Sequence, residues 1–124
     1  MKRIQRKRTK GWRMPDGVIY VGRPSMWGNP FKDDNGLVVI PGDGKLSHIQ
    51  LVLGSIDELG GASKVFRDML MDLNSHKVPA PIYRKMRLIR DRITDLGGKD
   101  LACWCSLDKS CHADALIELC KTYK

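Results

Sequence analysis

The segment near the C-terminal end of the chain constrains the fold more than any other, because it combines three kinds of structure in a short stretch. Residues 99–105 (Lys-Asp-Leu-Ala-Cys-Trp-Cys) have the apolar character of a buried strand, and residues 111–122 carry apolar side chains at helical spacing. A short loop joins the two. Three of the four cysteines, one of the three histidines and one of the three tryptophans fall in this segment. It therefore predicts a strand–loop–helix unit with a functional site where the helix begins.

The remaining hydrophobic pattern alternates between strands and helices. Short β-branched runs predict strands at residues 18–21 and 37–40, with a turn at residues 33–36. Apolar residues at helical spacing predict helices at 63–73 and 82–96, and a short helix at 47–53 that is followed by a loop at 54–61. With 124 residues, the chain is predicted to form one small α/β domain over residues 17–124, in which a short sheet is flanked by helices.

Basic residues are clustered in a chain whose net charge is +8. Seven of them crowd the first thirteen residues (Lys2, Arg3, Arg6, Lys7, Arg8, Lys10 and Arg13), and five form a second block (Arg84, Lys85, Arg87, Arg90 and Arg92). We interpret residues 1–16 as a basic arm that stays mobile until an anionic partner orders it. Such clusters attract polyanions or phosphates, so a nucleotide or a nucleic acid is the expected partner. A solvated, solubilising surface is the alternative.

Neither a membrane span nor an export signal is recognised in the sequence. No apolar run approaches the roughly 20 residues of a transmembrane helix, and the charged N-terminus lacks the apolar core of a secretory signal. We therefore expect a cytoplasmic protein whose cysteines are reduced thiols. Cys120 ends an apolar helical face and is expected to be an ordinary core residue.

Three interpretations of the cysteine segment stay open. Cys103 and Cys105 share one face of the predicted strand, and Cys111 and His112 start a helix, where free backbone amides favour thiolates and anions. In the first interpretation, Cys103, Cys105, Cys111 and His112 bind zinc, although their spacing is not the usual one. In the second, Cys111, His112 and Asp114 are catalytic groups of a metal-free site, although adjacent Cys and His side chains rarely face one another. In the third, the cysteines and Trp104 are core residues and His112 bonds a carbonyl.

The loop after the first predicted strand, residues 22–31, is the second candidate for a binding site. Arg23 offers a planar fork for a phosphate, Trp27 could stack on a base, Gly28 would let a ligand approach the backbone, and Asn29 could read a base edge. In the structural alternative, Trp27 packs inward and Asn29 caps a turn. The ligand-binding residues that we expect are Arg23, Ser25, Trp27, Gly28, Asn29, Cys103 and Cys105.

Two motifs carry a resemblance to a known family. They are Gly-Arg-Pro-Ser-x-Trp-Gly-Asn-Pro-Phe at residues 22–31 and Leu-Ala-Cys-Trp-Cys at 101–105 with Cys-His-Ala-Asp at 111–114. With these motifs the chain resembles the domain-of-unknown-function family numbered 4326, small proteins of bacteria and phages. Family members often carry prolines where this chain has Ser106 and Ser110. The resemblance implies a bacterial or phage origin and supplies no mechanism.

Three functional hypotheses follow. The first is a protein that binds a nucleotide, nucleoside or nucleic-acid group between the Arg23–Phe31 loop and the start of the last helix, and could catalyse transfer or hydrolysis at a glycosidic or phosphate bond. The second is a non-enzymatic DNA- or RNA-binding accessory protein, which zinc could stabilise. Deleting residues 1–13 should abolish binding in the second case and matter little in the first. The third is a phage protein that binds and inhibits a host protein, favoured by an exposed apolar patch without a concave pocket.

Overall fold

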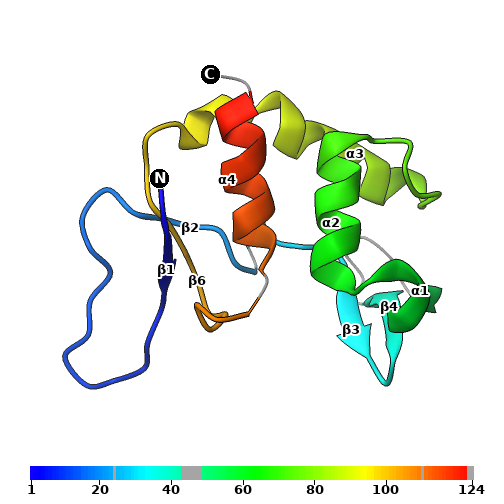
Figure 1. The fold of residues 1–124 in the computed structure, drawn as a ribbon, viewed down its shortest axis with the longest axis horizontal. Coiled ribbons are helices and arrows are strands. Elements are labelled where there is room, and N and C mark those ends of the chain that lie inside the picture. The colour runs from blue at the N-terminus through cyan, green and yellow to red at the C-terminus, as the bar shows by residue number, and fades with distance from the viewer. Residues whose placement is uncertain (24, 43–48, 110, 123–124) are drawn as a thin grey trace.

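The computed structural model describes residues 1–23, 25–42, 49–109 and 111–122. Strands and helices alternate within one small mixed α/β fold (Figure 1). The elements are, in chain order, β1 (Arg3–Gln5), β2 (Ile19–Tyr20), β3 (Lys32–Asp34), β4 (Leu37–Ile40), β5 (Leu51–Ser55), α1 (Ile56–Leu59), α2 (Ala62–Met71), α3 (Ala80–Asp91), the 3-10 helix η1 (Ile93–Leu96), β6 (Leu101–Cys103) and α4 (His112–Thr122). The predicted α/β class is confirmed.

The first sheet is parallel and has the order β1-β6-β2. Leu101 is aligned with Arg3 on one side and with Ile19 on the other, so β6 is the central strand. All three residues of β6 are buried, as is usual for the centre of a parallel sheet. Because the three strands run in the same direction, their carboxyl ends meet at one edge of the sheet.

The second sheet is antiparallel and has the order β3-β4-β5. Asn35 and Gly36 join β3 to β4, and their φ angles of +50° and +78° form the two-residue turn that matches the twist of a hairpin. At the end of β5, the Ser55 hydroxyl accepts a hydrogen bond from the Glu58 amide at 3.1 Å and so caps α1.

Helices α2 and α4 pack side by side over the core (Figure 1). Their apolar faces supply fully buried side chains such as Phe66, Met69 and Leu116, each of which contributes roughly 1.5–3 kcal/mol to stability. On the outside, the Arg67 guanidinium donates two hydrogen bonds to Glu118, at 2.9 and 2.8 Å. No helix of the described residues is both long and apolar enough to cross a lipid bilayer.

Several predicted elements agree with the structure and others do not. The strand at 37–40, the strand cores within 18–21 and 99–105, and the helices near 63–73 and 111–122 are confirmed. Cys120 is buried as expected, and all four cysteines are free thiols. The helix predicted at 82–96 ends at Asp91, and its last part is η1. The turn predicted at 33–36 overlaps strand β3, which was missed.

Two predictions are wrong because long-range pairing overrides local sequence. The helix predicted at 47–53 is contradicted by β5, whose apolar residues pair with β4 (residues 47 and 48 lie outside the described part). A short apolar run does not distinguish strand from helix by itself. Similarly, Arg3–Gln5 forms β1 within the stretch expected to be a mobile arm, because β6, almost a hundred residues away, pairs with it.

Candidate functional site

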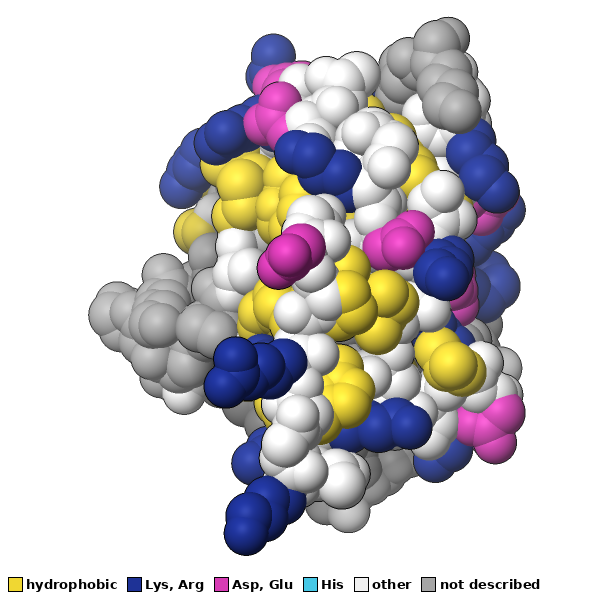
Figure 2. Space-filling model, turned by 90° about the vertical axis from the view of Figure 1, so that its left-hand side faces the viewer, with side chains coloured by type: hydrophobic (Ala, Val, Ile, Leu, Met, Phe, Trp, Pro, Cys, Tyr) yellow, Lys and Arg dark blue, Asp and Glu magenta, His cyan; other side chains and the backbone are white. Residues whose placement is uncertain are grey.

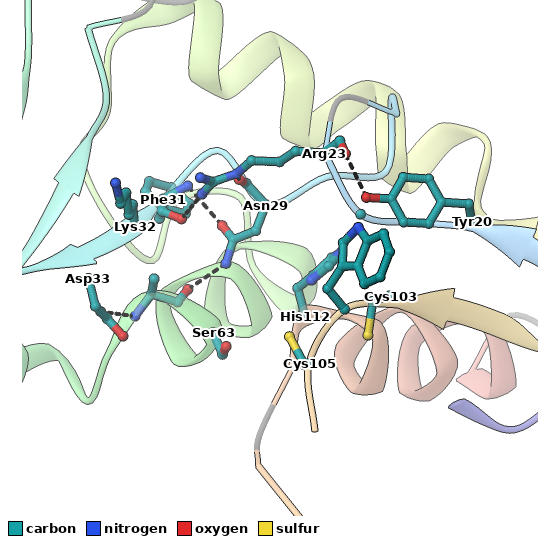
Figure 3. A pocket seen from close by; sticks show the side chains of 13 residues that line it. Tyr20, Arg23, Asn29, Phe31, Lys32, Asp33, Ser63, Cys103, Cys105 and His112 are labelled. Carbon is teal, nitrogen blue, oxygen red and sulfur yellow. Dashed lines mark hydrogen bonds between the residues drawn. The ribbon is translucent and has the colours of Figure 1, made fainter. Parts of the chain in front are cut away.

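A pocket of about 350 Å³ opens at the carboxyl edge of the parallel sheet (Figure 3). The residues around it come from the loop after β2, from β3, from the start of α2, from the end of β6 and from the start of α4. They are Tyr20, Gly22, Arg23, Asn29, Phe31, Lys32, Asp33, Ala62, Ser63, Cys103, Trp104, Cys105 and His112. The loop motif and the cysteine motif, some eighty residues apart in the sequence, are therefore neighbours in space.

Three thiols form a compact cluster beside this pocket. The sulfur atoms of Cys103, Cys105 and Cys111 all lie within 4.8 Å of one another, and those of Cys103 and Cys111 are 3.2 Å apart. Cys103 and Cys105 line the pocket, whereas Cys111 is buried behind them. The sulfurs are close enough to hold a metal ion in common.

His112 connects this cluster to the parallel sheet. Its Nε2 atom lies 2.7 Å from the carbonyl oxygen of Val21. A carbonyl can only accept, so Nε2 carries the hydrogen. The Nδ1 atom lies 3.5 Å from the sulfur of Cys111. The expectation that these adjacent side chains do not face one another is therefore wrong: Cys111 lies just before α4, and the chain turns there into the helix that begins at His112.

Hydrogen bonds within the cluster determine where the negative charge resides. The thiol of Cys103 donates to Cys111, and together with His112 and the Ala113 amide this lowers the pKa of the Cys111 thiol to about 3, against the opposing effect of burial. The same contact, reinforced by burial, raises the pKa of Cys103. Burial also raises the pKa of Cys105. The lowered pKa of Cys111 and the raised pKa of Cys103 both favour placing the negative charge of the cluster on Cys111.

Arg3 contacts the candidate site, which the sequence did not reveal. Its side chain is only 8% exposed. Its Nη2 atom donates to the carbonyls of Ser106 and Leu107 at 3.1 and 2.8 Å, and Nη1 lies 3.4 Å from a carboxylate oxygen of Asp114. Burial opposes the charge, but contact with Cys111 and the nearby Asp114 carboxylate raise the pKa of the Arg3 guanidinium. Arg3 thus fixes the loop between β6 and α4 and places a cation beside the thiolate. In the sequence it is one basic residue among seven.

The loop after β2 is held by its own polar side chains. Arg23 donates from Nε to the Asn29 carbonyl at 2.9 Å and from Nη2 to the Phe31 carbonyl at 2.6 Å. The Asn29 amide donates to the Ala62 carbonyl at 3.2 Å and accepts from the Phe31 amide at 2.8 Å. A Cβ at Gly28 would approach the Ser25 carbonyl to 3.2 Å. These residues therefore shape the pocket wall, as the structural alternative for the loop suggested for Asn29.

The ligand-binding and catalytic residues expected from the sequence are divided between the pocket and other parts of the structure. Arg23, Asn29, Cys103, Cys105 and His112 line the pocket, whereas Ser25 and Gly28 do not. Trp27 is 7% exposed and belongs to the core, so it presents no face to a base. Asp114 is paired with Arg3.

A wall of alternating rings and cations borders the pocket, and it was not anticipated from the sequence. The Arg6 guanidinium lies 4.7 Å from the Tyr20 ring centroid and 4.5 Å from that of Trp104. The Arg8 guanidinium lies 4.5 Å from the Trp104 ring centroid. The Tyr20 hydroxyl donates to the Arg23 carbonyl at 2.6 Å, and a Cβ at Gly22 would overlap it. Glycine at position 22 therefore allows Tyr20 to close this side of the pocket.

Comparisons with known proteins identify the family. No curated protein and no solved structure matches the chain. The sequence model of a family described as a domain of unknown function, DUF4326, matches residues 4–122. This match begins within β1 and includes both motifs, strands β2 to β6 and helices α1 to α4. The chain therefore belongs to the DUF4326 family.

Proposed function

We propose that the pocket binds a nucleotide or nucleoside, with the base against Tyr20 and Trp104 and any phosphate near Lys32 and Arg23. The observation that carries the proposal is the position of the pocket at the carboxyl edge of a parallel sheet, where open α/β folds bind their ligands. Its volume of about 350 Å³ is within the range of small-molecule sites.

The side chains around the pocket match the chemistry of such a ligand. Tyr20 and Trp104 offer aromatic surface for a base. Among the described residues, no carboxylate pairs with Arg23 or Lys32, so both positive charges remain for a phosphate. Asp33, the one acidic group among the described residues that line the pocket, already accepts a hydrogen bond from the Ala62 amide at 2.8 Å.

The thiol cluster supports zinc as the metal in this proposal. Zinc binds cysteine thiolates, and three protein ligands leave a fourth position for water or substrate, as in catalytic zinc sites. Cys111 holds the cluster's negative charge, and Arg3 would offset the charge of further thiolates. His112 is oriented by a backbone carbonyl in the manner of residues that support a metal site. It lies outside the group of three sulfurs, so we assign it a supporting role.

Zinc beside a nucleotide favours one class of reaction. A bound zinc ion supplies a Lewis acid and an activated water. Hydrolysis or transfer at a glycosidic or phosphate bond is therefore the activity that we would assay. The alternative of an inhibitor of a host protein receives no support from a concave pocket of this composition.

Metal content and ligand binding can be measured on the same preparations. Native mass spectrometry of chelator-free protein should show one zinc ion in the wild type and none in Cys111→Ser. Cys120→Ser is the matched control, because Cys120 is a buried free thiol that bonds the Ile93 carbonyl outside the cluster. A bare mass for the wild type, or zinc retained in Cys111→Ser, contradicts the zinc proposal.

Calorimetric titration with a panel of nucleosides and nucleoside monophosphates tests the pocket. Lys32→Ala should weaken binding of the monophosphate more than binding of the nucleoside. Lys121→Ala removes the same charge from the last turn of α4 and should change neither. If no member of the panel binds the zinc-loaded protein, the nucleotide proposal is wrong.

A further inference from the structure

We propose that the ligand of this site is part of a single-stranded nucleic acid, and that one unpaired base stacks on Trp104 in place of Arg8. This inference rests on the proposed function, because it extends the pocket's nucleotide into a polymer. In this arrangement, the nucleic-acid strand runs from the pocket along residues 6–18, the connection between β1 and β2.

The wall of alternating rings and cations extends beyond the residues that line the pocket. Tyr20 and Trp104 line the pocket, and Arg6 lies within 4.7 Å of both ring centroids. Arg8 contacts the Trp104 ring from outside the set of lining residues. Both cations of the wall, Arg6 and Arg8, therefore lie outside the set of lining residues, and Arg8 is exposed. Neutral aromatic rings interleaved with cations are the groups that single-strand binding proteins present to bases and phosphates.

Trp104 and Arg8 are arranged so that a base can replace a cation. Trp104 is 39% exposed, which is unusual for a large aromatic side chain in this protein. Arg8 is exposed, and its contact with the ring is a surface cation–π pair, the weakest kind. Base–aromatic stacking is stronger than such a contact. A base that stacks on the Trp104 ring would displace the Arg8 guanidinium, which could then pair with a phosphate of the same nucleic-acid strand.

Arg6 differs from Arg8 because it is a fixed part of the wall. Its Nε atom is buried and has no hydrogen-bond partner among the described residues, so the two rings, not an acid, hold the guanidinium. Its positive charge is therefore not neutralised by the protein. This charge lies between the two aromatic surfaces, where it can attract a phosphate that links stacked bases.

The charge around the wall exceeds what one free nucleotide needs. Lys7, Arg8, Lys10 and Arg13 are exposed, and none of them forms an ion pair within the described part of the chain. The connection that carries them projects from the left side of the molecule in Figure 1, the side that faces the viewer in Figure 2. There, basic side chains lie around a band of hydrophobic ones, with some acidic side chains between them (Figure 2). Cations beyond the pocket gain binding energy only from a ligand with several phosphates.

A single strand fits this surface better than a duplex does. Stacking on Trp104 needs an unpaired base, because the faces of paired bases are covered by their neighbours. The binding surface is the wall of aromatic rings and cations at the carboxyl edge of the parallel sheet. The basic helix of the described chain, α3, contributes no residue to the pocket lining, so no helix suited to a major groove belongs to this surface.

The test is the affinity of the zinc-loaded full chain for a fluorescein-labelled single strand of mixed sequence, about a dozen nucleotides long. Fluorescence anisotropy should show tight binding that weakens steeply with salt. Trp104→Ala should weaken it at least about tenfold, and Trp104→Phe should retain most of it, since one ring replaces another. Arg8→Glu changes an exposed side chain and leaves the core intact. It should weaken binding of the strand and make the affinity less dependent on salt concentration. Lys121→Glu changes the net charge equally and is the control.

Binding should also quench tryptophan fluorescence, and this quenching should disappear in Trp104→Phe. Equal losses for Trp104→Ala and Lys121→Glu, or equal affinity for a duplex of the same sequence, would overturn the single-strand proposal.

Nucleoside monophosphate binding separates this proposal from the one on which it rests. If the monophosphate binds as tightly as the labelled strand, the polymer inference fails and the pocket remains. If the strand binds in a Trp104-dependent way but Lys32→Ala has no effect on either ligand, the stacking surface stands and the pocket proposal fails.

Discussion

The imidazole of His112 donates a hydrogen bond from Nε2 to the Val21 carbonyl at 2.7 Å and thereby joins the start of α4 to the end of β2. The same ring lies edge-on to Phe66 of α2, with ring centroids 5.5 Å apart and an interplanar angle of 84°. Because one nitrogen is committed to the carbonyl, the other faces the Cys111 sulfur. One side chain thus couples the sheet, both central helices and the thiol cluster.

His112→Phe should destabilise the protein by about 1–3 kcal/mol, because it leaves the buried Val21 carbonyl without its donor. The phenyl ring keeps the contact with Phe66, so the loss reports the hydrogen bond and not a cavity. Urea denaturation measures the change. His76→Gln is the control, since its one bond within the described residues is to the partly exposed Asp68, and such pairs contribute up to about 1 kcal/mol. An equal effect of the two substitutions would contradict this role for His112.

Arg3→Met should cost about 1.5–3 kcal/mol, because it removes charged hydrogen bonds to two loop carbonyls. Arg3→Lys should recover only part of this, since an ammonium lacks the planar fork that reaches both carbonyls. Deleting residues 1–13 would remove β1 and Arg3 together, so that truncation does not separate binding from folding. If urea denaturation shows both Arg3 variants to be as stable as the wild type, Arg3 does not hold the loop.

The stability of the metal-free protein should rise with pH in the neutral range. The folded-state pKa of Cys111, about 3, lies far below its value of 9.0 in an unfolded chain. Stabilisation from a depressed pKa is complete above the unfolded value and is lost as the pH falls towards the folded value. Between about pH 7 and about pH 8 the folded cluster holds one proton fewer, so the free energy of unfolding should rise by up to about 1.4 kcal/mol per pH unit.

Cys111→Ser removes the ionisation of Cys111, so the free energy of unfolding should change little between about pH 7 and about pH 8. Urea denaturation in the presence of a chelator makes the comparison. Burial would raise the pKa of Asp68, but hydrogen bonds and attraction from Lys64 and His76 lower it overall. Arg67 lowers the pKa of Glu118. Because their pKa values are lowered, those carboxylates stay ionised between about pH 7 and about pH 8 and do not contribute to the change. Parallel profiles for the wild type and Cys111→Ser would contradict a lowered Cys111 pKa.

Trp27 and Trp104 should respond to substitution in opposite ways. Trp27→Ala should cost about 3–5 kcal/mol, because it empties a core position. Trp104→Ala should cost about 1 kcal/mol, the order of its surface cation–π contacts. Trp27→Phe should leave ligand binding intact. If Trp27→Phe and Trp104→Ala reduce nucleotide binding to the same extent at equal foldedness, Trp27 and not the wall is part of the site.

Elements whose signals are local could be predicted from the sequence. The helix near 63–73 has an apolar face that repeats at helical spacing, and the strand at 37–40 follows an Asn-Gly turn. Residues 51–53 were predicted as helix and residues 54 and 55 as loop, because an apolar run has no period of its own. Only pairing with β4 makes residues 51–55 a strand. β1 was missed for the same reason, since three residues among many cations gain strand structure only from β6.

The sequence by itself determined which residue types gather in the two motifs, and hence that a strand ends and a helix begins at the cysteines. It could not determine contacts between distant segments, because these depend on how the chain closes on itself. Only the tertiary structure placed Arg3 beside Cys111 and Asp114, buried Trp27 and put Tyr20, Arg6 and Trp104 in one wall. The parallel order β1-β6-β2 is the physical reason, because it brings three distant carboxyl ends to one edge of the sheet.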